Sequence, residues 1–191
     1  RREEIILSQS ESISGVVDNL IKDRSIIGKN LYQKHMTHHM VCSVPRDWLD
    51  QVKHVFLLRH PARVISSFKK KHNKISEEDI GFRKQVELFS EITKRGLDPI
   101  VVNSEDIRKK PEEILTKLCN RVNLSFQKSM LSWPKGGNKK DGVWAPHWYG
   151  SAHKSTGFSG QEDNLPNLKG RNANLAEASM PLYSSLLKFA I

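Results

Sequence analysis

A chain of 191 residues is long enough for one domain with a sizeable core, so we predict a single domain over residues 1–191. Its 31 lysines and arginines against 21 acidic residues give a net charge of +10, which favours anionic partners: nucleotides, phosphorylated or sulfated small molecules, or nucleic acid. The only two cysteines, Cys42 and Cys119, exclude a disulfide framework and a cysteine-based metal site, and both thiols are expected to be buried.

The start of the chain and the length of its apolar runs bear on its cellular location. No apolar run approaches the length of a membrane span, and the charged residues 1–4 do not begin a signal peptide. A cytoplasmic location is therefore expected. The first residue is not methionine, so a start partway into a longer chain stays open.

The first fifty residues contain weak signals for regular structure. Ser12 or Ser14 is a suitable cap for a helix that ends near residue 23. Residues 30–33 are predicted to form a short strand, and residues 45–50 a loop with one helical turn.

A histidine-rich stretch follows Lys34. His35 and His39 have the spacing of two metal ligands on a helix, but no carboxylate or cysteine accompanies them, so no metal is expected. Two interpretations stay open for His35 and His38. Either one of them is a general base that accepts a proton near neutral pH, or they are ordinary solvent-facing histidines.

The most informative stretch is a strand, a turn and a helix that begins with proline. Residues 55–58 form an apolar run typical of a buried strand, and Pro61 has the fixed φ that suits the first turn of a helix. Arg59 lies between them, at the carboxyl end of the strand, where open α/β sheets bind their ligands. A guanidinium beside a helix start favours a phosphate, and Ser66 or Ser67 can add a hydroxyl.

The next hundred residues predict the rest of an α/β fold. Ser76 and Asp79 have the spacing of a capping box, and an amphipathic helix follows up to Gly96. Residues 99–102 predict a second buried strand, and Pro111 a further helix. Between them, adjacent Glu105 and Asp106 are expected to cap or to form salt bridges. These elements predict a parallel sheet flanked by helices.

Residues 133–158 are rich in Gly, Pro, Trp and Lys and predict a long loop, of the kind that often carries function. Its aromatic side chains can either bind a ligand or hold the loop to the protein. From residue 174 a last helix is predicted, which Pro181 is expected to kink or divide.

The segment R-H-P-A-R-V-I-S-S resembles the nucleotide 3′-phosphate segment of sulfotransferases that use 3′-phosphoadenosine 5′-phosphosulfate (PAPS). By this resemblance, Arg59 and Ser67 hold the 3′-phosphate. Lys34 and His35 match the position of the family's strand lysine and of an acid-base residue close after it, with His38 as the alternative base. The segments D-G-V-W-A-P-H-W-Y and S-T-G-F are similar to those of a bacterial and plant subgroup.

The resemblance also assigns roles within the late loop. In the family, a loop of glycines and cations closes over the nucleotide, and this role falls here to Lys135, Gly136, Gly137 and Lys139. The acceptor pocket is expected to include Trp144, His147, Trp148 and Tyr149.

The resemblance implies a P-loop-NTPase-like sulfotransferase fold and a specific reaction. PAPS is the expected co-substrate, and the sulfuryl group passes to a hydroxyl or amine of a small-molecule or carbohydrate acceptor. The family's first βα unit, with its 5′-phosphosulfate loop, has no counterpart in residues 1–30, so an N-terminally truncated, inactive fragment is expected. A non-catalytic nucleotide- or phosphate-binding protein is the alternative. A basic nucleic-acid-binding domain is disfavoured because no such motif occurs. The oligomeric state is not indicated.

Overall fold

The computed structural model describes residues 2–7, 12–22, 28–138 and 141–191. The chain forms two compact units, which are described separately. The first unit comprises Arg1–Gln33, Cys42–Gln51 and Gln127–Ser159, and the second unit comprises Lys34–Val41, Val52–Phe126 and Gly160–Ile191.

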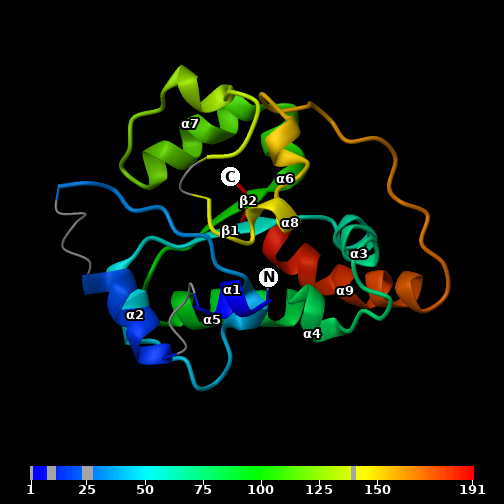
Figure 1. Ribbon diagram of the computed structural model, residues 1–191, viewed down its shortest axis with the longest axis horizontal. Helices are drawn as coiled ribbons and strands as arrows, with labels where there is room; N and C mark the ends of the chain where they lie inside the picture. Colours follow the sequence, from blue (N-terminus) through cyan, green and yellow to red (C-terminus); the bar gives the residue numbers. More distant parts are fainter. Residues whose placement is uncertain (1, 8–11, 23–27, 139–140) are drawn as a thin grey trace. The chain divides into compact units, whose positions relative to one another are not determined.

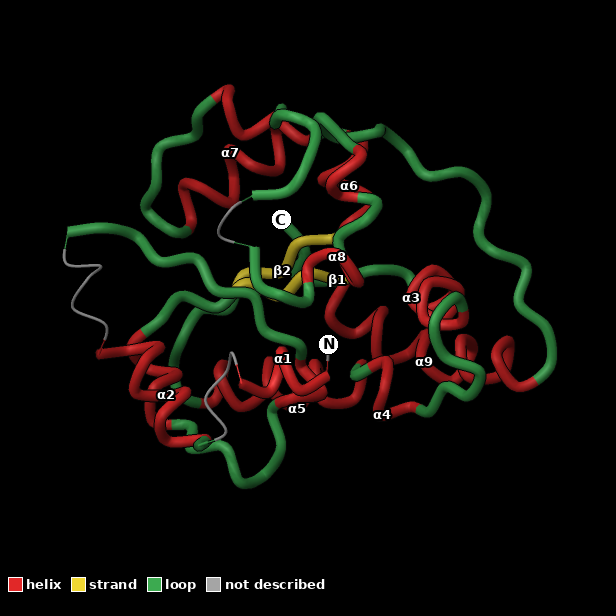
Figure 2. Tube along the Cα trace, viewed as in Figure 1, coloured by secondary structure: helices red, strands yellow, loops and turns green. Residues whose placement is uncertain are grey.

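A small parallel sheet forms the centre of the second unit. Strand β1 (Val55–Leu58) pairs in parallel with β2 (Ile100–Asn103), and Phe56 lies opposite Val101. The end of the chain extends the pairing, because Ile191 N donates to Val101 O at 3.1 Å. The predicted α/β class with a parallel sheet is confirmed (Figure 1; Figure 2).

The strands are connected through helices α3 (Pro61–Lys69), α4 (Glu77–Ile80) and α5 (Phe82–Lys94). After β2 come α6 (Ser104–Lys109), α7 (Pro111–Arg121) and the last helix, α9 (Arg171–Leu187). Because the two strands run in the same direction, their carboxyl ends, the start of α3 and the start of α6 meet at one edge of the sheet.

Helices of the second unit cover both faces of the sheet (Figure 1). On one face, the Phe56 ring packs 5.6 Å from Phe89 of α5, which in turn lies 4.9 Å from Phe189. On the other face, Ile100 and Val102 form a buried cluster with Ile114 of α7, its members being 4% exposed or less. All four residues of β2 are buried, whereas β1 buries Phe56 and Leu58 and leaves the alternate residues Val55 and Leu57 exposed.

Within the described residues of the second unit, no strand pairs with the far side of β1. Ile100 N donates to His54 O, so the alternation of the ladder turns the backbone groups of Val55 and Leu57 away from β2. Val55 and Leu57 are 44% and 60% exposed. The amide of Gln85 donates to Leu57 O at 3.1 Å.

The helix starts follow the predicted signals closely. Pro61 is the first residue of α3, and the residue before it, His60, caps the helix because its Nδ1 accepts from Ala62 N at 3.2 Å. Ser76 and Asp79 form the predicted capping box of α4. Gly81, at φ +68°, separates α4 from α5, so the predicted helix is divided there, and Gly96 ends it at φ +79°.

The structure departs from the sequence-based expectations at four places. Residues 30–33 are not a strand, since Leu31 and Tyr32 are 47% and 87% exposed and lie in irregular structure. Cys42 is exposed, whereas Cys119 is buried as expected. Residues 104–109, for which no element was predicted, form α6. Helix α9 is continuous through Pro181, so the proline does not divide it.

The first unit contains only short helices among its described residues. They are α1 (Arg2–Leu7), α2 (Ile13–Lys22), α8 (Ala145–Trp148) and the 3₁₀ turns Asp47–Gln51, Lys128–Leu131 and Ala152–Lys154. Ser12 caps α2 as predicted, since its Oγ accepts from Gly15 N at 3.3 Å. Trp48 and Leu49 are buried in the predicted turn. None of the described helices is long and apolar enough to cross a membrane.

Candidate functional site

A cluster of charged side chains lies where the two strands end. Arg59 follows β1, Arg63 lies in the first turn of α3, and Glu105 lies at the start of α6. Glu162 joins them from the irregular segment that precedes α9. We call these four residues the strand-end cluster.

Two guanidinium groups hold one carboxylate in this cluster. Arg59 Nη2 donates to Glu162 Oε1 at 2.6 Å, and Arg63 Nε lies 3.1 Å from Glu162 Oε2. The second contact is an ion pair without hydrogen-bond geometry, since Oε2 is buried and accepts no hydrogen bond from the described residues. Arg63 Nε also donates to Glu105 Oε1 at 3.4 Å, which confirms the salt-bridging role expected for Glu105.

The cluster is partly shielded from water. The side chains of Arg63 and Glu162 are 11% and 15% exposed, whereas Arg59 is 41% exposed. Ion pairs in such surroundings are screened less than surface pairs, so the two arginines attract a carboxylate more strongly than scattered surface cations would.

A hollow of about 730 Å³ opens beside the cluster. It is lined by His60, Arg63, Glu105, Lys109 and residues 161–165. Burial lowers the pKa of His60, against the opposing effect of Glu105, so its ring is neutral at pH 7. Its wall carries the cations Arg63 and Lys109 and the carboxylates of Glu105, Glu162 and Asp163, and Arg59 lies outside the lining. A hollow of this size can take a small molecule.

Only one of the two residues predicted to hold the 3′-phosphate lies in the cluster. Arg59 lies there, but Ser67 is exposed on α3, two turns beyond Pro61. Arg63 and Glu162 were not predicted. The sequence contains a signal for Arg63, since this second arginine comes four residues after Arg59 and falls in the first turn of the predicted helix. Glu162 has none, because it is 103 residues from Arg59.

The predicted base residues lie elsewhere in the second unit, around the 3₁₀ turn Thr37–His39. The rings of His38 and His39 are in edge contact at 4.4 Å. Partial burial of each ring, and then the charge of His39, lower the pKa values of both His35 and His38. Lys34 is exposed, and the rings of His35 and His38 are each covered only in part. Across the described ranges, no three histidine, cysteine or acidic side chains are grouped as metal ligands.

The late loop belongs to the first unit and is held by contacts of its own. Gly136 N donates to His153 O at 2.8 Å, and His153 Nε2 lies 3.0 Å from Asp141 Oδ2. A side chain on Gly137 would approach the His153 ring at 3.0 Å, so the ring would have to shift by a few tenths of an ångström to admit it. Lys135 is exposed, and Lys139 lies outside the described residues.

The four residues predicted to line the acceptor pocket lie together at α8. Trp144 Nε1 donates to the Tyr149 hydroxyl at 3.4 Å, and the rings of His147 and Trp148 are in edge contact at 4.9 Å. Trp148 is 50% exposed. The aromatic groups therefore form one local surface of the first unit.

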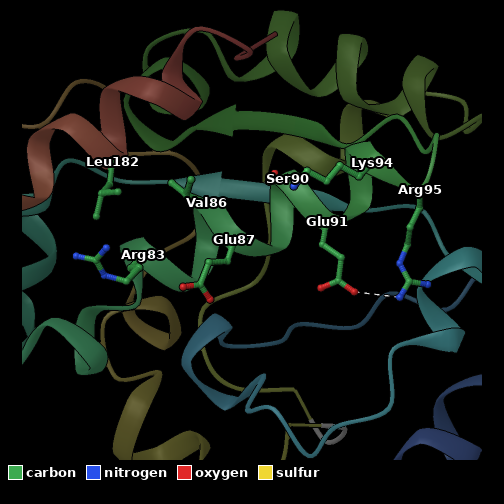
Figure 3. Close-up of a pocket in the computed structure, with 8 residues that line it drawn as sticks. All are labelled: Arg83, Val86, Glu87, Ser90, Glu91, Lys94, Arg95 and Leu182. Atoms are coloured by element: carbon green, nitrogen blue, oxygen red, sulfur yellow. Dashed lines mark hydrogen bonds and ion pairs between the residues drawn. The ribbon is translucent and has the colours of Figure 1, made fainter.

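A second hollow of about 660 Å³ lies on α5 beside Leu182 (Figure 3). Four of its charged side chains are paired with neighbours, as in Glu91 with Arg95 at 3.0 Å and Glu87 with Lys84 at 2.5 Å. Pairs at this spacing are typical of a solvent-facing helix surface. The hollow beside the strand-end cluster is therefore the stronger candidate.

A parallel sheet with cations at its carboxyl edge is the arrangement in which open α/β proteins bind their ligands. The solved structure of a sulfotransferase domain from the curacin biosynthetic pathway has a similar fold, with a TM-score of 0.50 and 20% identity. The likeness covers 87% of this chain and 66% of that chain. The family model described as a sulfotransferase domain matches residues 1–190. The chain belongs to the sulfotransferase domain family.

Two curated relatives come from Arabidopsis thaliana. Branched-chain-amino-acid aminotransferase-like protein 1 is 35% identical over 158 residues, and protein 2 is 33% identical over 161 residues. Each match covers 83% of this chain but only 28% and 29% of the relatives. The chain thus spans less than a third of the length of the curated relatives that it matches.

Proposed function

We propose that this chain binds the nucleotide of PAPS and takes part in transferring its sulfuryl group to a hydroxyl or amine of a small-molecule or carbohydrate acceptor. The observation that carries the proposal is the meeting of Arg59 and Arg63 on one carboxylate at the carboxyl end of β1. Membership of the sulfotransferase domain family supports the same reaction class.

The proposed roles follow from the chemistry of the groups. Arg59 grips the 3′-phosphate through paired N–H donors, and Ser67 of α3 adds a hydroxyl. The sulfur–oxygen bond to the 5′-phosphate breaks as a bond from sulfur to the acceptor atom forms. The acceptor proton passes to His35 or His38, and Lys34 neutralises the bridging oxygen of the leaving phosphate. As in phosphoryl transfer, positioning and charge neutralisation supply most of the catalysis.

The first unit has a proposed part in binding. Lys135, Gly136, Gly137 and Lys139 would cover the nucleotide, and the aromatic residues at α8 would contact the acceptor. A P-loop-NTPase-like topology, a cytoplasmic location and the lack of a 5′-phosphosulfate loop in this chain stay predictions. The lack of the loop is tested by comparing sulfuryl transfer by this chain with sulfuryl transfer by any longer natural form of the protein.

Calorimetry with adenosine 3′,5′-bisphosphate tests the binding site. Arg59→Ala removes a charge-assisted contact, so we expect it to weaken binding by about 1.5 to 3 kcal/mol. Arg95→Ala is the matched control, since it removes an equal charge from the α5 surface. The proposed site is wrong if the natural chain does not bind the nucleotide, or if both variants lose affinity equally.

Transfer of label from PAPS separates catalysis from binding. The assay uses the longest natural form of the protein. If that form binds adenosine 3′,5′-bisphosphate but transfers no label to any hydroxyl or amine acceptor, the protein is a non-catalytic nucleotide-binding protein. A steep loss of polynucleotide binding with salt, in place of nucleotide binding, would identify a nucleic-acid-binding domain instead.

A further inference from the structure

The segment around Glu162 is tied to the strand ends by three arginines. Arg108 Nε donates to Gly160 O at 3.1 Å, and Arg63 Nη2 donates to Asp163 O at 2.5 Å. Between these two backbone anchors, the Glu162 side chain reaches Arg59 and Arg63. The backbone on either side is therefore held independently of the Glu162 carboxylate.

We propose that the Glu162 carboxylate is an internal competitor for the anion of the ligand, so that a phosphate monoester binds by displacing it from Arg59 and Arg63. The proposal rests on the proposed function, because it concerns the same two guanidinium groups. It adds that the nucleotide site is closed by the chain's own acidic side chain when no ligand is bound.

The charges of the strand-end cluster suit such an exchange. Arg59 and Arg63 contribute two positive charges, and Glu105 and Glu162 two negative ones, so the cluster is neutral as it stands. Without Glu162 it carries one positive charge. A phosphate monoester carries a charge of about −1.5 to −2 at pH 7 and has three acceptor oxygens. It therefore brings more negative charge and more hydrogen-bond acceptors to Arg59 and Arg63 than one carboxylate does.

The geometry lets the carboxylate leave while the chain stays in place. The bonds at Gly160 and Asp163 use backbone carbonyls, so they survive rotation of the Glu162 side chain. Arg63 keeps its contact with Glu105 when Glu162 leaves. Arg59 is the more exposed guanidinium, so an incoming anion reaches it first. Exchange then requires rotation of one side chain rather than unfolding of the segment.

While Glu162 occupies the two guanidinium groups, they are unavailable to the ligand. The apparent affinity is therefore the intrinsic affinity multiplied by the fraction of molecules in which the arginines are available. Glu162→Gln removes the competing charge and keeps the side chain's size. We expect the variant to bind adenosine 3′,5′-bisphosphate about threefold to tenfold more tightly than the natural chain, the range set by a partly shielded ion pair.

Glu177→Gln is the matched control. It makes the same substitution at an exposed glutamate of α9 that does not line the hollow. We expect its affinity to change by less than about twofold, because exposed charges are largely screened at physiological salt. An equal gain in both variants would mean that general charge, not displacement, sets the affinity, and would overturn the proposal.

The melting temperature without ligand gives a second readout. Loss of the ion pairs lowers it in Glu162→Gln, while affinity rises, and a merely structural role for Glu162 would lower both. Unchanged or weaker nucleotide binding by Glu162→Gln, with Arg59→Ala still harmful, overturns the displacement and leaves the nucleotide site standing. No nucleotide binding by any of the proteins overturns both. If Glu162→Gln does not fold, Glu162→Asp takes its place in the test, because it retains the charge but shortens the reach of the side chain. We then expect a gain in affinity that is smaller than the one expected for Glu162→Gln.

Discussion

The imidazole of His60 lies 5.7 Å from the ring of Tyr183, so a residue of α9 contacts the residue that caps α3. The Tyr183 hydroxyl also donates to Asn103 Oδ1 at 3.4 Å, at the end of β2. Asn103 in turn caps α6 by accepting from Glu105 N at 3.4 Å. The two helix starts beside the strand-end cluster are therefore supported by one tyrosine.

The cap at His60 makes stability depend on pH. Its Nδ1 accepts a hydrogen bond only when the ring is neutral there, and burial lowers its pKa in the folded protein. A lowered pKa gives stability that is complete above the unfolded value of about 6.5 and is lost as the pH falls through the folded value. We expect His60→Asn, a good cap that does not titrate, to reduce the drop in melting temperature between pH 8 and pH 5.

His72, an exposed histidine beyond the end of α3, provides the comparison. The variant His72→Asn should retain the full drop in melting temperature. An unchanged pH dependence in His60→Asn would show that another group carries it.

Gly81 connects the helical core to the histidine turn. It has φ +68°, and an added Cβ would lie 2.7 Å from Thr37 Oγ1, which donates to Gly81 O at 3.3 Å. Gly96 has φ +79° and open space around the same position. We expect Gly96→Ala to cost about 1 to 2 kcal/mol of unfolding free energy for the backbone alone, and Gly81→Ala to cost more.

Urea denaturation of both variants measures the difference between them. Because Thr37 begins the turn that carries His38, Gly81→Ala should also change the pKa of His38, read from its imidazole NMR signals. Equal costs in the two variants would mean that Thr37 moves aside freely.

The pH profile of sulfuryl transfer can identify the base. A base must be unprotonated, so activity is complete above its pKa and falls below it. The lowered pKa values of His35 and His38 place that fall below pH 6.5. Replacing the true base by glutamine should reduce kcat/KM by about 10² to 10⁴ and remove the acidic fall. The same replacement at the other histidine serves as the control. Full activity in both variants would contradict the assignment of His35 and also that of His38.

Local signals in the sequence were sufficient for the sheet and its helix starts. The run at residues 55–58, Pro61, and the pair Ser76 and Asp79 each act through neighbours within a few residues, and each is confirmed. Residues 30–33 have a similar local pattern but no neighbouring strand. β-propensity reports fit to a sheet surface, so without a partner the segment stays irregular.

The candidate site was predictable only in part, because its ion pairs are long-range. Arg59 could be read from the end of a strand, but its partner Glu162 is 103 residues away. His60 was missed as a cap because histidine is not among the residues preferred at that position. Ser67 was identified by resemblance alone, and the structure leaves its side chain exposed.

The far side of β1 also affects how the protein behaves at high concentration. Val55 and Leu57 present apolar side chains and backbone groups that turn away from β2, which is the template on which strands of separate molecules associate. Gln85 occupies one carbonyl, at Leu57. Since no strand among the described residues of the second unit covers this edge, we expect molecules of this chain to self-associate through β1 as the concentration rises.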